Sequence, residues 1–120
     1  MSYFIKQFPK SETALLIMDA QEKIMHPIKN KDFILSNIFK LLKAYEIFGE
    51  NIYISEQNPL KLGTTVEQLI PKTDFKKFEK MDFSIANNKK LNNELSSKKI
   101  KQFIVCGFET HICILQSVLG

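Results

Sequence analysis

Two short apolar segments, each closed by a polar residue or a glycine, constrain the fold of this chain most strongly. Residues 14–18 form an unbroken apolar run that ends at Asp19, and a second apolar segment ends at Gly107. Because a run this short, with no polar alternation, fits a strand buried on both faces, the two segments predict inner strands of a parallel sheet. The second of these strands is expected over residues 100–106.

Helical and extended patterns alternate along the rest of the chain. Apolar residues recur at helical spacing over residues 33–48, whereas residues 51–55 and 75–80 are typical of strands. The other expected elements are a helix over 91–99, a short helix or turn over 66–70, a last helix starting at Glu109 or Thr110, and loops over 21–28, 56–63 and 81–88. This alternation predicts one α/β domain over residues 1–120, with a parallel sheet flanked by helices.

Four polar side chains follow or end the expected strands. They are Asp19, Glu56, Lys80 and Cys113. Because the carboxyl ends of parallel strands meet at one edge of a sheet, we expect these side chains to gather there.

Cys113 stands where a turn gives way to the last helix. The positive end of the helix dipole and the free N–H groups of the first turn favour a thiolate at such a place, so Cys113 is a candidate nucleophile. The alternative is a small, buried and inert side chain, since free cysteines are commonly buried. Cys106 lies within the apolar strand and is predicted to belong to the core.

An acid, a lysine and a cysteine at one sheet edge suit a hydrolase. Asp19 would take the proton of Cys113 and later return it to the leaving group, and Lys80 would hold Asp19 and stabilise the anionic intermediate. Cys113 would form a thioester-like intermediate that water cleaves. Taken singly, Asp19 also fits a turn residue and Lys80 a solvent-facing lysine. Gln21, Glu56, Gln57 and Phe83 are candidate residues of the substrate pocket.

Composition argues against a nucleic-acid partner and a membrane protein. The net charge is +4, but all 17 basic residues are lysine, and the chain lacks arginine, which recognises phosphate and guanine bidentately. No apolar run approaches the ~20 residues that span a bilayer. The first ten residues lack the apolar core of a signal peptide, and the two cysteines fit reduced thiols, so a cytoplasmic location is expected.

The sequence offers no cofactor motif. The two histidines, His26 and His111, lie far apart, and the chain has no Cys-x-x-Cys pair, so no metal is expected. The four glycines form no phosphate-binding motif. His111 is predicted to have a structural or pocket-wall role.

Three sequence blocks together resemble the isochorismatase-like cysteine hydrolases. The blocks are Ala14-Leu15-Leu16-Ile17-Met18-Asp19-Ala20-Gln21, Lys80-Met81-Asp82-Phe83-Ser84 and Cys106-Gly107-Phe108-Glu109-Thr110-His111-Ile112-Cys113-Ile114. A middle segment, residues 55–66, is similar to the isochorismatase domain-containing subgroup. The resemblance implies a three-layer Rossmann-like fold and an Asp19–Lys80–Cys113 triad. It also implies a small-molecule substrate and a homo-oligomer.

The resemblance further implies an oxyanion hole built from the backbone N–H groups of Glu109 and Cys113. In this family a cis peptide bond helps to aim the first of these groups, and here it would be the Phe108–Glu109 bond. A cis bond without proline costs ~3 kcal/mol and is kept where geometry demands it.

Two departures from the family pattern bear on function. The nicotinamidases carry an aspartate and histidines after the second strand, where this chain has residues 56–59 as Glu-Gln-Asn-Pro, so neither a metal nor nicotinamide is expected. Isochorismate is not expected either, since family members that hydrolyse it do so without a cysteine nucleophile. Family chains also continue beyond the nucleophile helix, so we expect a fragment that lacks the later strands and self-associates. The alternative function is therefore a catalytically silent fragment that acts in protein association.

Overall fold

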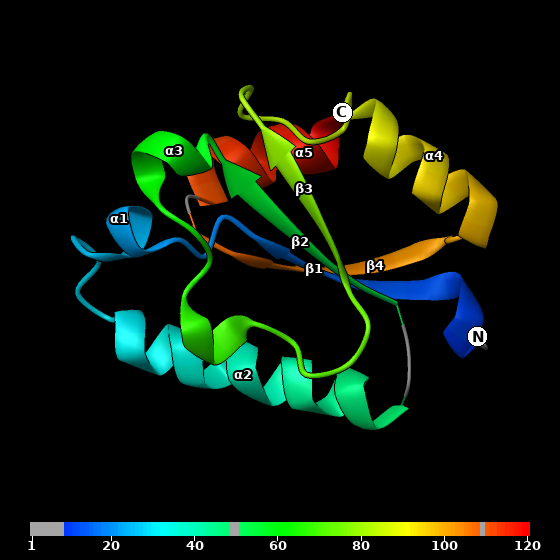
Figure 1. Ribbon diagram of the computed structural model, residues 1–120, viewed down its shortest axis with the longest axis horizontal. Coiled ribbons are helices and arrows are strands. Elements are labelled where there is room, and N and C mark those ends of the chain that lie inside the picture. Colours follow the sequence, from blue (N-terminus) through cyan, green and yellow to red (C-terminus); the bar gives the residue numbers. More distant parts are fainter. Residues whose placement is uncertain (1–8, 49–50, 109) are drawn as a thin grey trace, which may run out of the picture.

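The computed structural model of this 120-residue chain has a four-stranded parallel sheet at its centre (Figure 1). It describes residues 9–48, 51–108 and 110–120, the last segment without the side chains of residues 110 and 111. The strands are β1 (Thr13–Met18), β2 (Asn51–Gln57), β3 (Lys76–Lys80) and β4 (Gln102–Gly107), in the spatial order β3-β2-β1-β4. All four predicted strands are confirmed in position, with ends shifted by one or two residues. The prediction that the strand over residues 100–106 is an inner strand buried on both faces is wrong, because β4 lies at an edge of the described sheet and none of its residues is buried.

Strand β1 lies inside the sheet between β2 and β4. Its residue Leu16 pairs with Tyr53 on one side and with Val105 on the other. Five of the six residues of β1 are buried, as the unbroken apolar run predicts for a strand covered on both faces.

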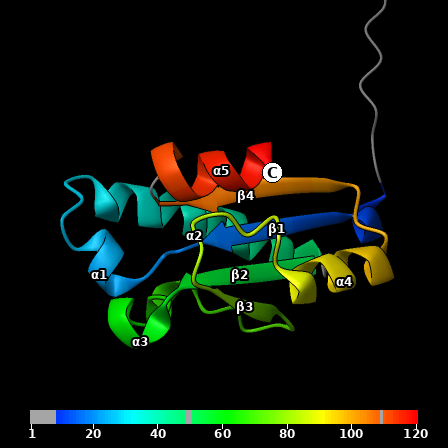
Figure 2. The ribbon, with the colours of Figure 1, turned by 90° about the horizontal axis from the view of Figure 1, so that it is seen from above.

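Helices cover both faces of the sheet, which makes three layers (Figure 1), and the strands lie side by side in the view from above (Figure 2). One face packs against α2 (Lys31–Phe48) and the 3-10 turn η2 (Glu67–Leu69), and its core includes Leu15, Ile17 and Leu42. The other face lies beneath α4 (Lys89–Lys98) and the C-terminal helical segment, and its core includes Leu16 and Met18. Successive residues of β1 therefore serve opposite cores, because side chains alternate along a strand.

The predicted long helices are confirmed, and their ends are set locally. At the start of α4 the Asn88 side chain accepts a hydrogen bond from the Leu91 N–H at 3.0 Å. At its end Lys99 adopts a left-handed conformation, φ 55°, and its N–H reaches the carbonyl groups of the last turn.

The prediction of loops over 21–28 and 56–63 is wrong in part. Helix α1 (Glu22–Met25) lies in the first segment, and it forms because Ile24 and Met25 bury there. In the second segment β2 continues to Gln57, and helix α3 (Pro59–Leu62) follows. Pro59 favours the first turn of α3 because its φ is preset and its missing N–H has no helical partner. Tertiary burial and a proline at a helix start outweighed the polar composition.

The last helix begins as a π-helical turn, η3 (Thr110–Ile114), which continues into α5 (Leu115–Leu119). Thr110 is thus the first described residue of this segment, and Glu109 lies outside the described residues. None of the helices in the described part of the chain has the length and apolarity needed to cross a membrane.

Gly107 joins β4 to the segment that carries Cys113. Its φ is 146°, and a Cβ atom at this position would overlap the backbone carbonyl of Met18. The next residue, Phe108, donates its N–H to the same carbonyl oxygen at 3.2 Å. A side chain at position 107 would therefore push β4 away from the end of β1.

We predict that Gly107→Ala lowers the free energy of unfolding by more than about 2 kcal/mol, because overlap adds to the strain of a positive φ. Urea unfolding measures the effect. Gly63→Ala is the matched control, since Gly63 has φ 80° but open space around it. That control should lose only about 1 kcal/mol. Equal losses in the two variants would show that the approach of Met18 does not matter.

Candidate active site

The structure brings Asp19, Gln57 and Lys80 together at the carboxyl ends of β1, β2 and β3. Asp19 directly follows β1, and the other two residues end their strands. The register aligns these ends, because Met18 pairs with Ser55 and Gln57 pairs with Lys80. The expected gathering at one sheet edge is confirmed for Asp19 and Lys80. From β2 it is Gln57 that joins them, whereas the predicted Glu56 bonds Thr65, because successive side chains of a strand point to opposite faces.

A buried ion pair joins the acid and the lysine. The Lys80 Nζ atom lies 2.9 Å from Oδ2 of Asp19, and the two side chains are 3% and 0% exposed. An ion pair this deep needs further hydrogen bonds to offset the loss of hydration. Lys80 is therefore not the solvent-facing lysine that its position in the sequence also allows.

The hydrogen bonds of the Lys80 ammonium group go to acceptors other than Asp19. Its Nζ donates to Oε1 of Gln57 at 2.7 Å and to the carbonyl groups of Phe83 at 2.9 Å and Asp82 at 3.3 Å. Three acceptors use the three donors of an ammonium group. Oδ2 of Asp19 has no hydrogen-bond partner among the described residues. The contact between Asp19 and Lys80 is thus a contact of charges outside hydrogen-bond geometry, and it leaves Oδ2 open.

The backbone and Ser55 fix the carboxylate. Asp19 has φ 55°, a left-handed conformation that few residues other than glycine adopt. Its N–H donates to the Ser55 carbonyl at 3.1 Å, and Oδ1 accepts from the Ser55 hydroxyl at 2.9 Å. Strain of this kind gathers at functional sites, where the surroundings hold it. Sequence reasoning missed Ser55, although a hydroxyl at the end of an apolar strand was a signal.

Cys113 lies in η3, just beyond β4. It is 1% exposed and belongs to the same apolar cluster as Met18, the residue that precedes Asp19. Single π-helical turns occur often at functional sites. The predicted Glu109 oxyanion donor and the Phe108–Glu109 cis bond fall on a residue outside the described part of the chain. The same holds for the side chain of His111.

Cys106 is a different thiol. It is partly buried and packs against the core on the α2 face of the sheet. Burial raises its pKa to about 12, so it stays protonated at neutral pH. The prediction that Cys106 belongs to the core is confirmed.

The candidate pocket residues lie around the ion pair in different ways. The Gln21 side chain is fully buried and bonds the backbone of Gln57 and Gly63. Glu56 is also buried, and its Oε2 accepts hydrogen bonds from the backbone and the hydroxyl group of Thr65. The Phe83 side chain is 51% exposed, whereas its carbonyl holds Lys80.

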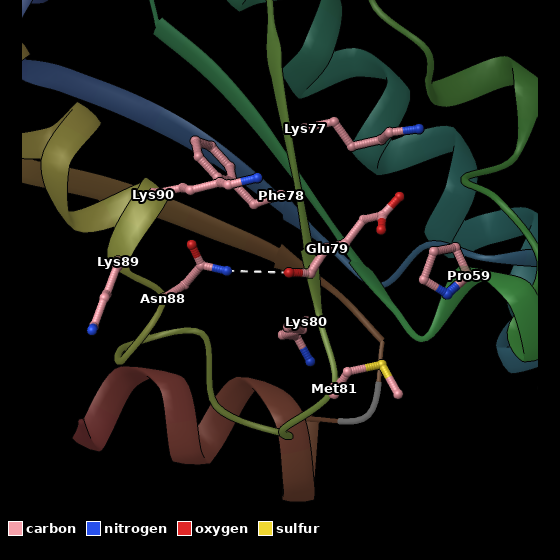
Figure 3. A pocket seen from close by; sticks show the side chains of 9 residues that line it. All are labelled: Pro59, Lys77, Phe78, Glu79, Lys80, Met81, Asn88, Lys89 and Lys90. Carbon is pink, nitrogen blue, oxygen red and sulfur yellow. Dashed lines mark hydrogen bonds between the residues drawn. The ribbon is translucent and has the colours of Figure 1, made fainter.

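A cavity of about 660 Å³ lies beside Lys80 (Figure 3). It lies between the end of β3, the start of α4 and Pro59 of α3, and its lining includes Phe78 and Met81. Asn88 bridges two of these elements by donating to the Glu79 carbonyl at 3.1 Å. Among the described residues its lining takes in Lys80 but neither Asp19 nor Cys113.

No metal-binding group of three or more His, Cys, Asp or Glu side chains occurs within residues 9–48, 51–108 and 110–120. The carboxylates that the structure places at the sheet edge bond to Ser55 and Thr65 or lie against lysines.

A family model described as the isochorismatase domain matches residues 13–120. Isochorismatase family protein 1A of Dictyostelium discoideum is 33% identical over 110 residues, which are 88% of this chain and 53% of that protein. Human isochorismatase domain-containing protein 2 is 31% identical over 108 residues, 89% of this chain and 51% of its own. The chain thus spans about half the length of these relatives.

Solved structures share the fold. A protein described as the MAR1 ribonuclease of Caenorhabditis elegans superposes with a TM-score of 0.84 at 29% identity. The match covers 95% of this chain and 59% of that one. A cysteine hydrolase from Pseudomonas syringae has a TM-score of 0.83 at 21% identity and covers 99% of this chain and 70% of its own. The second likeness concerns the fold alone.

We predict that Lys80→Met lowers the free energy of unfolding by about 3–5 kcal/mol, because it leaves the buried Asp19 charge uncompensated. Asp19→Asn in the same chain should restore at least about 1 kcal/mol, since the residual charge is then gone. A double-mutant cycle by urea unfolding measures this coupling. If the two losses in unfolding free energy simply add, Asp19 and Lys80 do not stabilise each other.

We predict that stability falls at alkaline pH through Cys106 and Tyr53. Burial raises both pKa values to about 12 from ordinary values of 9.0 and 10.0, and the neighbouring Glu94 carboxylate adds to the rise for Tyr53. The unfolded chain therefore loses these protons first, so their contribution is intact below about pH 9 and is lost as the pH climbs towards 12. Urea unfolding between pH 7 and 11 tests this. The Cys106→Ala/Tyr53→Phe variant should show a flatter pH dependence, and an identical slope would refute the assignment.

Proposed function

Because this chain belongs to the isochorismatase family, we propose that it is a cysteine-dependent hydrolase that cleaves an amide, other C–N or ester bond of a small molecule. The observation that carries the proposal is the buried Asp19–Lys80 ion pair, in which Oδ2 of Asp19 has no hydrogen-bond partner among the described residues. A buried carboxylate oxygen with an open lone pair, held beside a cation, suits a group that takes and returns a proton.

The reaction proceeds in two halves. In the first, Asp19 takes the thiol proton of Cys113, and the sulfur attacks the substrate carbonyl carbon. The C–N or C–O bond then breaks, and the leaving group receives the proton from Asp19. In the second, Asp19 takes a proton from water, and the hydroxide attacks the thioester. The C–S bond breaks, and Asp19 returns its proton to the Cys113 sulfur. The product leaves as a carboxylic acid, which loses its proton to water.

Lys80 supplies positive charge throughout both halves. Its ammonium group lies in contact with Asp19 and far from bulk water, where an electrostatic effect is larger than at the surface. It offsets the negative charge that develops on the substrate. The backbone N–H groups of Glu109 and Cys113 complete the proposed site as donors to the oxyanion.

The substrate occupies the space beside this ion pair. Phe83 suits a pocket wall because half of its side chain is exposed. Gln21, Glu56 and Gln57 support the pocket from the ends of β1 and β2 rather than from its open side. We further propose a cytoplasmic homo-oligomer. Exposed apolar side chains on α5 agree with self-association.

Those exposed apolar side chains also favour the alternative function, a silent module for protein association. Leu115, Val118 and Leu119 are 49%, 64% and 77% exposed. Binding of a protein partner would then survive the loss of the Cys113 thiol. Because the C. elegans structural neighbour is described as a ribonuclease, an RNA oligonucleotide belongs among the tested compounds.

We predict that Cys113 is alkylated by iodoacetamide at pH 6 at least about ten-fold faster than the cysteine of an unstructured model peptide, since the cation of the proposed site favours its thiolate. Peptide mass spectrometry of the native chain measures the rate, and Cys106 should stay unreactive because burial raises its pKa to about 12. Asp19→Asn/Lys80→Met should slow Cys113 to the rate of the model peptide or below while the circular dichroism spectrum stays native. A screen of small amides, esters and RNA then follows, in which Cys113→Ser abolishes turnover of the amide or ester.

Two results would contradict the hydrolase proposal. One is a Cys113 that reacts no faster than the model peptide in a folded chain. The other is turnover that persists in Cys113→Ser, because a thioester-like intermediate needs the sulfur.

A further inference from the structure

Gln57 holds the Lys80 ammonium group more closely than Asp19 does. The distance from Lys80 Nζ to Oε1 of Gln57 is 2.7 Å, and the geometry is that of a hydrogen bond. Asp19 lies 2.9 Å from the same nitrogen but outside that geometry. A neutral amide thus receives a proton that the neighbouring carboxylate would otherwise accept.

The Gln57 side chain has a defined orientation. Its Nε2 donates to the Met81 carbonyl at 2.8 Å while Oε1 faces the ammonium group. Reversing the amide would set a donor against a cation and an acceptor against a carbonyl oxygen, so only one orientation satisfies both neighbours. The Gln57 backbone is fixed as well, because its N–H donates to Oε1 of Gln21 at 2.7 Å.

The carbonyl groups of Phe83 and Asp82 occupy the other donors of Lys80. Together the three acceptors turn the protons of the ammonium group away from Asp19. The positive charge remains in contact with the carboxylate, but Oδ2 keeps its lone pairs. This combination is unusual, since a lysine beside a carboxylate ordinarily forms a charge-assisted hydrogen bond with it.

We propose that Gln57 is a positioning residue that draws a Lys80 proton away from Asp19, so that Oδ2 of Asp19 stays free to accept the proton of Cys113. The inference rests on the proposed hydrolase function and adds a role that is distinct from lining the pocket. Gln57 acts through Lys80 and Asp19 and does not itself touch the reacting atoms.

The test replaces the amide by groups that lack one or both of its bonds. Gln57→Met has a similar length but no acceptor for Lys80. In its crystal structure we expect the freed donor of Lys80 to turn to Oδ2 of Asp19 in hydrogen-bond geometry. Gln57→Glu keeps an acceptor for Lys80, and there Oδ2 should remain without a hydrogen bond from Lys80.

The second measurement is the pH profile of Cys113 alkylation. A hydrogen bond from Lys80 occupies the lone pair with which Oδ2 of Asp19 would accept the thiol proton. In Gln57→Met the midpoint of the profile should therefore rise by about one pH unit, which is a tenfold slower reaction below the midpoint. The titratable groups that the proposal places around the reacting sulfur are Asp19, Lys80 and the Cys113 thiol itself.

Thr65→Val is the matched control. Thr65 is also buried and bonds a buried carboxylate, Glu56, whereas the Lys80 ammonium group donates to Gln57 and to the loop after β3. The control should leave the midpoint and the Lys80 contacts unchanged. A general loosening of the fold would move the midpoint in both variants.

An unchanged Lys80 position or an unchanged midpoint in folded Gln57→Met overturns the role of Gln57. If that variant does not fold, Gln57→Asn carries the same expectation, because its shorter amide cannot reach both Lys80 and the Met81 carbonyl. Failure of the hydrolase proposal is distinguishable, since Cys113 of the unaltered chain would then react no faster than the model peptide. The crystal structures still decide whether Gln57 directs the Lys80 protons.

Discussion

The buried ion pair between Asp19 and Lys80 is the interaction on which the rest of the candidate site depends. Two charges removed from water are costly unless other groups satisfy them, and the chain supplies those groups from β2 and from the loop after β3. Ser55 holds one oxygen of the carboxylate, and Gln57 and the loop after β3 hold the ammonium group. The ends of β1, β2 and β3 are therefore tied together by charge as well as by the sheet.

The parallel sheet makes this arrangement possible at low cost. Three parallel strands that end at one edge bring residues from distant parts of the chain into contact without special loops. The apolar cores on the two faces hold the strands rigidly, so the polar groups at their ends have little freedom. Gly107 brings the end of the fourth strand to the same edge, since its lack of a side chain lets β4 approach Met18.

Two uncharged amide side chains hold the backbone and the lysine of the site in place. Gln21 and Gln57 lie buried at adjacent strand ends, and each bonds both a backbone donor or acceptor and a second segment. A neutral amide can bind a cation without adding charge, which a carboxylate in the same place cannot do. The site thereby keeps one negative and one positive group in contact instead of two carboxylates sharing one lysine.

Several features followed from the sequence alone. The unbroken apolar run before Asp19 determined a strand buried on both faces, and the alternation of patterns determined a parallel α/β sheet. Because such sheets gather chemistry at the carboxyl ends of their strands, Asp19 and Lys80 were found as partners from the sequence. Membership of the isochorismatase family, shown by the match over residues 13–120, agrees with the resemblance seen in the motif blocks.

Local patterns were less informative where tertiary contacts decide the structure. Helices α1 and α3 form within segments whose composition is typical of loops, because burial of Ile24 and Met25 and the proline at the start of α3 outweigh polar composition. Only the tertiary structure decided how the Lys80 protons are shared. Hydrogen-bond direction depends on angles among side chains from three strands, and neither residue type nor spacing carries that information. The sequence by itself determined which charges meet, and the fold decided which lone pair stays open.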